Sequence, residues 1–263
     1  MLYMLKLGGS LITDKNTPFT CKRHLIKRLA KEVAAALREQ GDLQLIIGHG
    51  SGSFGHTAAS KYKTQNGVKT KQDWLGFVEV WRQARLLNQI VVEALITAGI
   101  PAISFPPSSA IVCEDKQIKS WDISPIQTAL KSGLVPLIYG DVVLDNQIGG
   151  TILSTETLFF YLAAHLNPNR ILISGIEKGV WQDYPKRTEI IPQITPENFT
   201  QVQSSLYTSS CVDVTGGMYH KVKSMLKLVE QHPHCEITIF SGVEPNSVKK
   251  ALMGKTNGTT IKQ

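Results

Sequence analysis

The sequence predicts an α/β fold, with one open, mainly parallel sheet and helices on both of its faces. Two observations lead to this prediction. Apolar runs of about five residues alternate along the chain with segments of about ten or more residues that have helical periodicity. Glycine-rich loops follow several of these apolar runs. Parallel strands that are buried on both faces are apolar throughout, and the helices that connect them cover those faces.

Each expected strand is a short apolar run that ends at glycine, proline or another turn residue. Residues 2–7 end at Gly8-Gly9, and residues 43–47 end at Gly48. These residues interrupt regular structure, so each marks the end of a strand. The same reasoning predicts further strands over residues 100–105, 134–139, 142–144, 170–174 and 236–240.

The expected helices carry apolar residues three and four positions apart. Over residues 22–40, Leu25, Leu29 and Val33 recur at this spacing, and Gly41 follows where a helix C-cap belongs. Helices are expected over residues 22–40, 74–98, 155–166, 217–231 and 247–253. Two more are expected to begin at Ser124 and Thr195, because each of these residues precedes a proline, as an N-cap precedes a proline at the first helical position.

The composition describes a globular chain and limits its partners. The 263 residues include 28 Lys+Arg and 21 Asp+Glu, a formal net charge of +7. No apolar run approaches the roughly 18 residues that a membrane helix needs, and the start lacks the features of a signal peptide. The basic stretches are short and mixed with apolar residues, so we expect neither a nucleic-acid nor a membrane partner. The charge is interpreted as a field that favours small anionic ligands.

The cysteines predict a reducing environment. Four cysteines are widely scattered and form no C-x-x-C pair, so neither a structural zinc site nor a disulfide framework is expected. A metal site from His232, His234 and Cys235 is conceivable from spacing, but the intervening Pro233 favours a loop. The prediction is therefore a cytoplasmic protein with no metal ligands of its own.

The first loop that could carry chemistry follows the first expected strand. Gly8 and Gly9 allow the backbone to approach a ligand closely, and successive N–H groups, including that of Ser10, can form an anion nest. Lys6 precedes them and can reach a phosphate oxygen. The spacing is neither that of a Walker A loop nor G-x-G-x-x-G. A tight turn with a surface lysine is an equally good interpretation of this loop alone.

The second loop follows the second expected strand and reads His49-Gly50-Ser51-Gly52-Ser53-Phe54-Gly55-His56. Its glycines and serines lead into a helix, which makes a natural phosphate cradle at a helix N-terminus. His56 lies just past the loop, where it could donate a hydrogen bond to an anion. No G-x-S-x-G elbow occurs, so a hydrolase triad built on these serines is less attractive.

The third loop covers residues 213–218, with Lys221 four residues after Gly217. If a helix begins at Gly217, Lys221 lies one turn along it and can point back to the same anion. Two phosphate cradles and separate lysines suit phosphoryl transfer, because that reaction is catalysed mainly by positioning and by charge neutralisation.

Together these loops resemble those of the amino acid kinase superfamily, and most closely its isopentenyl phosphate kinase branch. Thr13-Asp14-Lys15, Pro106-Pro107-Ser108-Ser109 and Tyr139-Gly140-Asp141 also match, in the family's order and over nearly the whole chain. The most specific piece is the loop that ends at His56, because this branch uses a histidine there to hold a phosphate acceptor.

The resemblance implies one amino acid kinase domain over residues 1–263, with an acceptor-binding lobe over 1–153 and a nucleotide-binding lobe over 154–263. It implies ATP-dependent phosphorylation of isopentenyl phosphate to the diphosphate in isoprenoid biosynthesis, by a homodimer that uses ATP and Mg²⁺. The implied catalytic residues are Lys6, Lys15, His56 and Lys221. The implied nucleotide contacts are Lys6, Gly8, Gly9, Ser10, Gly52, Gly175, Gly179, Gly217 and Lys221, and the acceptor contacts are Ser51, Gly55, His56 and Thr155.

Two segments depart from the family's usual pattern. Ser154-Thr155-Glu156-Thr157 stands where the family has Ser-Gly-Asp-Asp, and Glu156 is expected to orient Lys6 or Lys221. Residues 174–180 stand where the family has Thr-Asp-Val-Asp-Gly-Val, and they lack its aspartates. This departure bears on how the nucleotide is bound.

Two alternatives remain beside the isopentenyl phosphate kinase. A phosphonate kinase of the fosfomycin-resistance type would use the same fold and the same chemistry. A catalytically silent regulator that binds a nucleotide or metabolite would agree with the altered loops, although the retained lysines and His56 argue against it. An apolar slot for a prenyl tail would favour the first reading, with candidate wall residues Phe77, Val78, Trp81 and Leu86.

Overall fold

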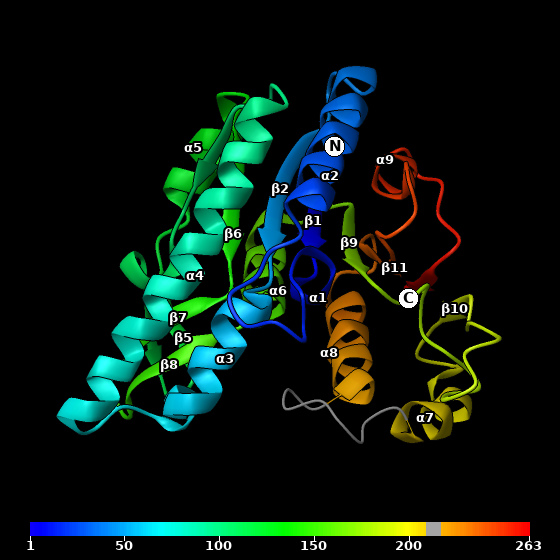
Figure 1. The fold of residues 1–263 in the computed structure, drawn as a ribbon. Helices are drawn as coiled ribbons and strands as arrows, with labels where there is room; N and C mark the ends of the chain where they lie inside the picture. The colour runs from blue at the N-terminus through cyan, green and yellow to red at the C-terminus, as the bar shows by residue number, and fades with distance from the viewer. Residues whose placement is uncertain (209–216) are drawn as a thin grey trace.

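The computed structural model describes residues 1–208 and 217–263, which form two sheets flanked by helices (Figure 1). The larger sheet has the strand order β10-β12-β11-β9-β1-β2-β6-β3. Neighbouring strands are parallel except for β11 and β12. The open, mainly parallel sheet is therefore confirmed. Its strands are β1 (Leu2–Leu7), β2 (Gln44–His49), β3 (Ala102–Ser104), β6 (Val135–Tyr139), β9 (Arg170–Gly175), β10 (Gln193–Ile194), β11 (Glu236–Ser241) and β12 (Thr259–Ile261).

The smaller sheet, of order β5-β4-β7-β8, is a departure from the expected single sheet. Only β7 coincides with a predicted strand. The Asp145 carboxylate accepts backbone N–H groups from Lys116 at 2.7 Å and from Gln147 at 2.9 Å, so one buried side chain holds two of its turns. No local pattern shows such a contact. The strands are β4 (Ile111–Glu114), β5 (Gln117–Trp121), β7 (Asp141–Asp145) and β8 (Gly149–Leu153).

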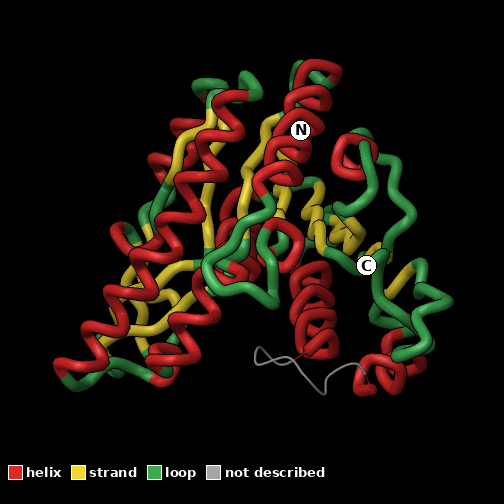
Figure 2. Tube along the Cα trace, viewed as in Figure 1, coloured by secondary structure: helices red, strands yellow, loops and turns green. Residues whose placement is uncertain are grey.

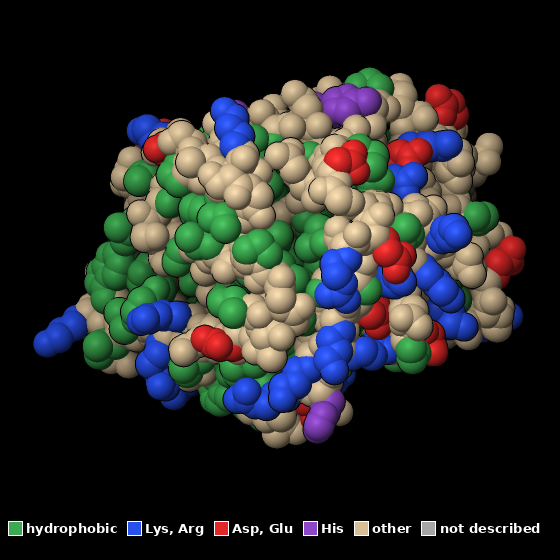
Figure 3. Space-filling model, turned by 90° about the horizontal axis from the view of Figure 1, so that it is seen from above, with side chains coloured by type: hydrophobic (Ala, Val, Ile, Leu, Met, Phe, Trp, Pro, Cys, Tyr) green, Lys and Arg blue, Asp and Glu red, His purple; other side chains and the backbone are tan. Residues whose placement is uncertain are grey.

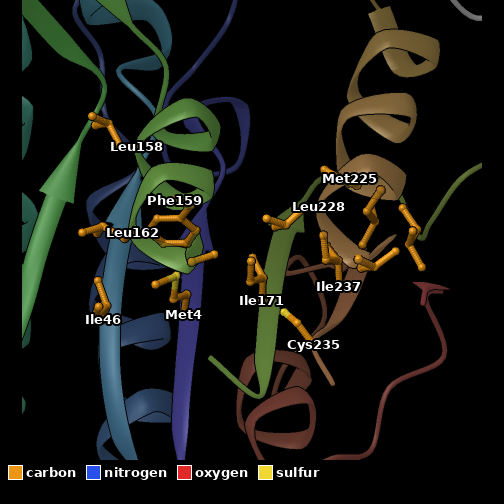
Figure 4. Close-up of a cluster of buried hydrophobic side chains, with 14 of the residues drawn as sticks. Met4, Ile46, Leu158, Phe159, Leu162, Ile171, Met225, Leu228, Cys235 and Ile237 are labelled. Carbon is orange, nitrogen blue, oxygen red and sulfur yellow. The ribbon is translucent and has the colours of Figure 1, made fainter. Parts of the chain in front are cut away.

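Helices cover both faces of the large sheet, as expected (Figure 2). Alternate residues of β1 point to opposite faces: Met4 joins a buried cluster with Phe159 of α6 (Figure 4), whereas Leu5 joins one with Leu29 of α2 and Leu87 of α4. The helices are α1 (Gly9–Ile12), α2 (Arg23–Glu39), α3 (Gly52–Tyr62), α4 (Lys71–Thr97), α5 (Ser124–Lys131), α6 (Thr155–Leu166), α7 (Phe199–Thr208), α8 (Gly217–Gln231) and α9 (Ser247–Leu252), with 3-10 turns at Thr64–Asn66 and Pro107–Ser109.

Several helix starts differ from the sequence prediction, and α4 begins at Lys71 rather than at Trp74. Helix α3 begins at Gly52, inside the second glycine loop, so the loop itself is shorter than expected. Ile123 occupies the N-cap of α5, and the Asp122 carboxylate, rather than Ser124, receives a backbone N–H there. Helix α7 begins only at Phe199.

The later start of α7 has a local cause. Asn198 accepts the backbone N–H of Thr195 at 2.9 Å, which forms a turn before the helix.

Among the residues that the structure describes, no helix is long and apolar enough to cross a membrane.

Candidate active site

Two glycine loops meet at the carboxyl ends of β1 and β2. These strands pair in parallel with Leu7 opposite His49, so the loops that follow them lie side by side. A Cβ on Gly9 would lie 2.5 Å from the backbone nitrogen of Gly52, and a Cβ on Gly50 would lie 2.8 Å from that of Gly9. Such an approach requires glycine. The structure thus brings two stretches of backbone N–H groups to one place.

The two loops border a cleft of about 1880 Å³ whose walls come from both halves of the chain. Most of the predicted site residues line it, namely Lys6, Gly8, Gly9, Ser10, Lys15, Ser51, Gly52, Gly55, His56, Thr155, Glu156, Gly175 and Lys221. The predicted nucleotide contact Gly179 does not, because it packs against Thr259, where a Cβ would lie 2.7 Å from the hydroxyl. Gly217 is the first residue of α8. Residues 213–216 of the third loop lie outside the described residues.

Glu156 lies between two lysines from opposite halves of the chain. Its carboxylate forms an ion pair with Lys6, and the side chains are 18% and 11% exposed. Burial alone would raise the pKa of Glu156, but the charge and hydrogen bond of Lys6 and the charge of Lys221 outweigh it, so the pKa lies below its usual value. The carboxylate is therefore ionised at neutral pH and holds the Lys6 ammonium at the wall of the cleft.

Lys15 lies on an exposed loop whose shape is fixed by its neighbour. The Asp14 carboxylate accepts the backbone N–H of Asn16 at 2.9 Å and the hydroxyl of Thr17 at 3.1 Å. These bonds hold the pKa of Asp14 below its usual value. Thr13 anchors the loop to both glycine loops, because its hydroxyl donates to Gly9 O at 2.7 Å and accepts Ser53 N–H at 3.0 Å.

His56 extends from α3, one turn after Gly52, where that helix starts. It is exposed and lines the cleft, together with Ser51 and Gly55. The N-terminus of a helix carries free N–H groups and a partial positive charge, both of which favour an anion. This geometry places an imidazole beside an anion site.

Thr155 joins the first residue of α6 to the second glycine loop. Its hydroxyl donates to the carbonyl oxygen of His49 at 2.7 Å, and its methyl group lies over Gly48, where a Cβ would come within 2.6 Å of it. Thr155 is buried at the floor of the cleft. The side chain that replaces the family's glycine is therefore a tether between two parts of the site.

Asp141 is a buried acid of the cleft to which the sequence analysis gave no role. Burial raises its pKa to about 6, although hydrogen bonds from Ser108 and Val142 oppose the rise. It follows Tyr139-Gly140 at the end of β6, so the signal that marks it is its place after a buried strand. Its motif was recognised in the resemblance, but a resemblance by itself does not show burial.

The altered loop after β9 contains a new arrangement. Glu177 accepts the indole N–H of Trp181 at 2.7 Å and pairs with Arg187 at 3.4 Å. All three residues line the cleft, and so does Tyr184. One glutamate therefore organises this wall in place of the family's aspartates.

Two of the four residues expected as an apolar wall on the long helix, Val78 and Leu86, are exposed. The other two, Phe77 and Trp81, pack against the buried cluster that contains Val80 and are not among the described residues that line the cleft. The side chains of α4 that line it are Val80 and Ala84, joined by Ile152 of β8. Positions 80 and 84 are four residues apart and share one face of the helix. Helical periodicity gives the spacing of that face, but only packing selects it.

The His49 ring predicts how stability depends on pH. Burial lowers its pKa to about 4, against 6.5 for the free side chain, although the hydrogen bond with Gly50 opposes this. The unfolded chain gains this proton near pH 6.5 and the folded chain only near pH 4. The contribution of the neutral His49 ring to the free energy of unfolding is therefore fully present above pH 6.5. It is lost as the pH falls toward 4, and the loss amounts to up to about 3 kcal/mol.

We expect the free energy of unfolding of His49→Phe to lack this fall between pH 6.5 and pH 4. The measurement is urea unfolding of both proteins between pH 7.5 and pH 4.5. Asp141 titrates in the same range with the opposite sign, but it is present in both proteins and cancels in the difference. An equal pH slope in the two proteins would contradict a neutral, buried His49.

Comparisons with known proteins agree with this geometry. The model of the amino acid kinase family matches residues 1–241. The isopentenyl phosphate kinase of Methanocaldococcus jannaschii is 38% identical, with 99% of this chain and 98% of that protein covered. The isopentenyl phosphate kinase of Methanothermobacter thermautotrophicus is 32% identical, with 99% and 98% covered. A solved structure of isopentenyl phosphate kinase superposes with a TM-score of 0.84 at 30% identity, and all of both chains is covered. The chain therefore belongs to the amino acid kinase family, in the branch that contains the isopentenyl phosphate kinases.

Proposed function

We propose that this protein transfers the γ-phosphoryl group of ATP to isopentenyl phosphate and so forms isopentenyl diphosphate. The observation that carries the proposal is one cleft that is lined by two features. These are the glycine-rich start of α3, with His56, and the Lys6–Glu156 pair. An acceptor phosphate and a nucleotide can meet there. The full-length relatives are isopentenyl phosphate kinases by name, which supports this acceptor.

The acceptor's phosphate oxygen attacks the γ-phosphorus, and the bond from that phosphorus to the bridging oxygen of ADP breaks. The attacking oxygen already carries negative charge, so no strong general base is required. Lys6, Lys15 and Lys221 neutralise charge on the transferring group and on the ATP phosphates. Glu156 keeps the two inner lysines directed at the cleft by its own charge.

The remaining predicted contacts are assigned by their place around the cleft. Backbone N–H groups of Gly8, Gly9, Ser10 and Gly52 receive the β- and γ-phosphates. Ser51, Gly55, His56 and the Thr155 backbone hold the acceptor. Residues 1–153 then form the acceptor-binding lobe and residues 154–263 the nucleotide-binding lobe, where Gly175 lies beside the nucleotide.

Magnesium enters this proposal as part of the substrate MgATP. Mg²⁺ commonly keeps water and phosphate oxygens as ligands, so an ion that the ATP phosphates carry needs few protein ligands.

The direct test is release of ADP over a panel of phosphorylated acceptors. Isopentenyl phosphate should give the highest kcat/KM, and the product should be the diphosphate by ³¹P NMR. A short polar phosphonate that outperforms every prenyl phosphate would replace this function with a phosphonate kinase. ADP release with none of them would favour the silent regulator.

We predict that the apolar residues lining the cleft determine which prenyl chain length the enzyme accepts. Val80, Ala84 and Ile152 form the apolar side of the cleft near α3, and a buried tail gains about 0.8 kcal/mol per CH₂ group. Val80→Ala should shift preference toward longer prenyl phosphates, and Ala84→Phe should exclude them by overpacking. The measurement is kcat/KM for a series of prenyl monophosphates, with the KM for ATP as the internal reference.

The matched control for chain length is Val78→Ala, because Val78 lies on the same helix but is exposed. It should leave the length profile unchanged. A profile that responds to Val78→Ala, or that ignores both Val80→Ala and Ala84→Phe, would contradict this wall.

We further propose a homodimer. Helix α4 exposes apolar side chains along its outer side, namely Leu75, Val78, Leu86 and Ile96. Hydrophobic side chains also gather on the side of the molecule that α4 and α5 occupy (Figure 3). Contiguous exposed apolar surface of this kind is typical of a contact with another chain. Sedimentation equilibrium tests the stoichiometry directly.

A further inference from the structure

A row of hydrogen-bonded polar side chains, buried at Asn88 and His49, ends at the second glycine loop and has no part in the chemistry proposed above. It begins at Ser104 of β3, continues through Asn88 of α4 and reaches His49, the last residue of β2. Nδ2 of Asn88 lies 2.8 Å from the Ser104 hydroxyl oxygen, and Oδ1 of Asn88 lies 3.2 Å from Nε2 of His49. Nδ1 of His49 lies 3.1 Å from the carbonyl oxygen of Gly50. The row therefore ends on the backbone of the glycine loop.

The His49 ring has no freedom to leave this position. It is fully buried and stacks on the Tyr139 ring, with the centroids 5.4 Å apart and the planes 6° apart. Its own carbonyl oxygen accepts the Thr155 hydroxyl at 2.7 Å and the Gly140 N–H at 3.2 Å. His49 is thus fixed from β6, α4 and α6 at once.

The hydrogen-bond donors along the row follow from the charge of the ring. Burial keeps the ring neutral at neutral pH, so it carries one N–H. The Gly50 carbonyl can only accept, so the proton must be on Nδ1. The opposite tautomer would set the Nδ1 lone pair against that oxygen. As the amide is placed, Asn88 Oδ1 faces Nε2 and Nδ2 donates to the Ser104 hydroxyl. A neutral ring cannot satisfy two acceptors, and the Gly50 carbonyl has no donor to offer, so we assign the Asn88 amide with its oxygen and nitrogen exchanged, with Nδ2 donating to Nε2. The amide oxygen then accepts from the Ser104 hydroxyl.

The hydrogen bond from His49 Nδ1 to the Gly50 carbonyl oxygen determines the direction of the Ser51 N–H. The Gly50 carbonyl and the Ser51 N–H belong to one planar trans peptide, in which they point in opposite directions. The carbonyl is held toward the buried ring. The Ser51 N–H therefore points away from it, toward the cleft that Ser51 lines. A rotation of this peptide would turn a carbonyl oxygen to the incoming anion instead.

We propose that His49, held by Asn88 and Ser104, is a positioning residue that fixes the Gly50–Ser51 peptide with its N–H toward the acceptor phosphate. This rests on the proposed function only in naming the ligand as the acceptor. Because the loop holds the acceptor, the effect of losing His49 should fall on the acceptor more than on ATP.

The kinetic test uses His49→Phe, which keeps a ring to stack on Tyr139 but removes both ring nitrogens, and Asn88→Leu. Each should raise the KM for isopentenyl phosphate about tenfold, the effect of one lost hydrogen bond to an anion, and leave the KM for ATP within about twofold. The control is Leu87→Ala, a fully buried neighbour of Asn88 on α4. It should lower the unfolding temperature with both KM values unchanged.

Two kinetic results would overturn the proposal. One is an unchanged acceptor KM in folded His49→Phe. The other is a parallel rise of both KM values in His49→Phe and Leu87→Ala, which would reduce His49 to a packing residue.

A second measurement does not depend on the substrate. The ¹⁵N chemical shifts of the His49 ring in the full-length protein distinguish protonated from unprotonated nitrogens. We expect a proton on Nδ1 alone at pH 7, and a changed Nε2 shift in Asn88→Leu. A proton on Nε2 would overturn the assignment. If the wild type phosphorylates no prenyl phosphate, the proposed function fails while this measurement still decides the role of His49.

Discussion

Lys6→Met should lower kcat about 100- to 1000-fold, as expected when one preorganised charge is removed from a developing phosphoryl transition state. Lys6 is the cation that Glu156 holds at the cleft, and the two side chains come from β1 and α6. The substitution leaves the buried carboxylate with Lys221 as its remaining close positive charge. Steady-state kinetics and thermal unfolding of the same sample measure the two consequences separately.

The double variant Lys6→Met/Glu156→Gln separates catalysis from stability. It should recover unfolding temperature, because no unpaired buried carboxylate remains, but it should not recover kcat. Lys119→Met is the matched control, since Lys119 is half-exposed and pairs with Glu114 on the smaller sheet. Recovery of kcat in the double variant would mean that Lys6 acts only by neutralising Glu156.

His56→Ala should lower kcat/KM for the acceptor about 10- to 150-fold, which corresponds to about 1.5–3 kcal/mol for a charge-assisted hydrogen bond. The imidazole stands one turn into α3, beside the backbone N–H groups that begin that helix. The KM for ATP should change little, because this loop lies on the acceptor side. The measurement is kcat/KM with each substrate varied in turn.

Two further variants sharpen the His56 prediction. His56→Gln keeps a donor at the same helix position and should retain more activity than His56→Ala. His24 is an exposed histidine of α2, and it is not among the described residues that line the cleft, so His24→Ala should behave as wild type. Equal kcat/KM in His56→Ala and wild type for every monophosphate would exclude His56 from acceptor binding.

Much of the fold is encoded in local patterns. β1, α6 and α8 have the predicted bounds because their apolar periodicity and their glycine or cap residues agree. Ser154 caps α6 by accepting the Thr157 N–H at 3.1 Å, as its place before the helix suggests. Lys6, the glycine loops and His56 could be identified because chemistry at the carboxyl ends of parallel strands follows from topology.

The tertiary structure decided what depends on contacts between distant residues. The smaller sheet depends on Asp145, whose carboxylate joins turns about 30 residues apart in the chain (115 and 116 against 145). The face of α4 that lines the cleft depends on which side packs against α3, β3 and β7. The apolar face offers Val80 and Leu87 equally as buried positions, but only Val80 meets the cleft.

By itself, the sequence determined the approximate ends of the central strands of the larger sheet, the places where the backbone must be glycine, and the lysines and histidine beside them. Those are properties of residues near one another in the chain. Only the tertiary structure decided that Glu156, expected beside Lys6 or Lys221, pairs with Lys6, that Asp141 is buried in the cleft, and that His49 is fixed from three elements. Charge pairing, desolvation and stacking act between side chains that folding brings together, so no local pattern of residues contains them.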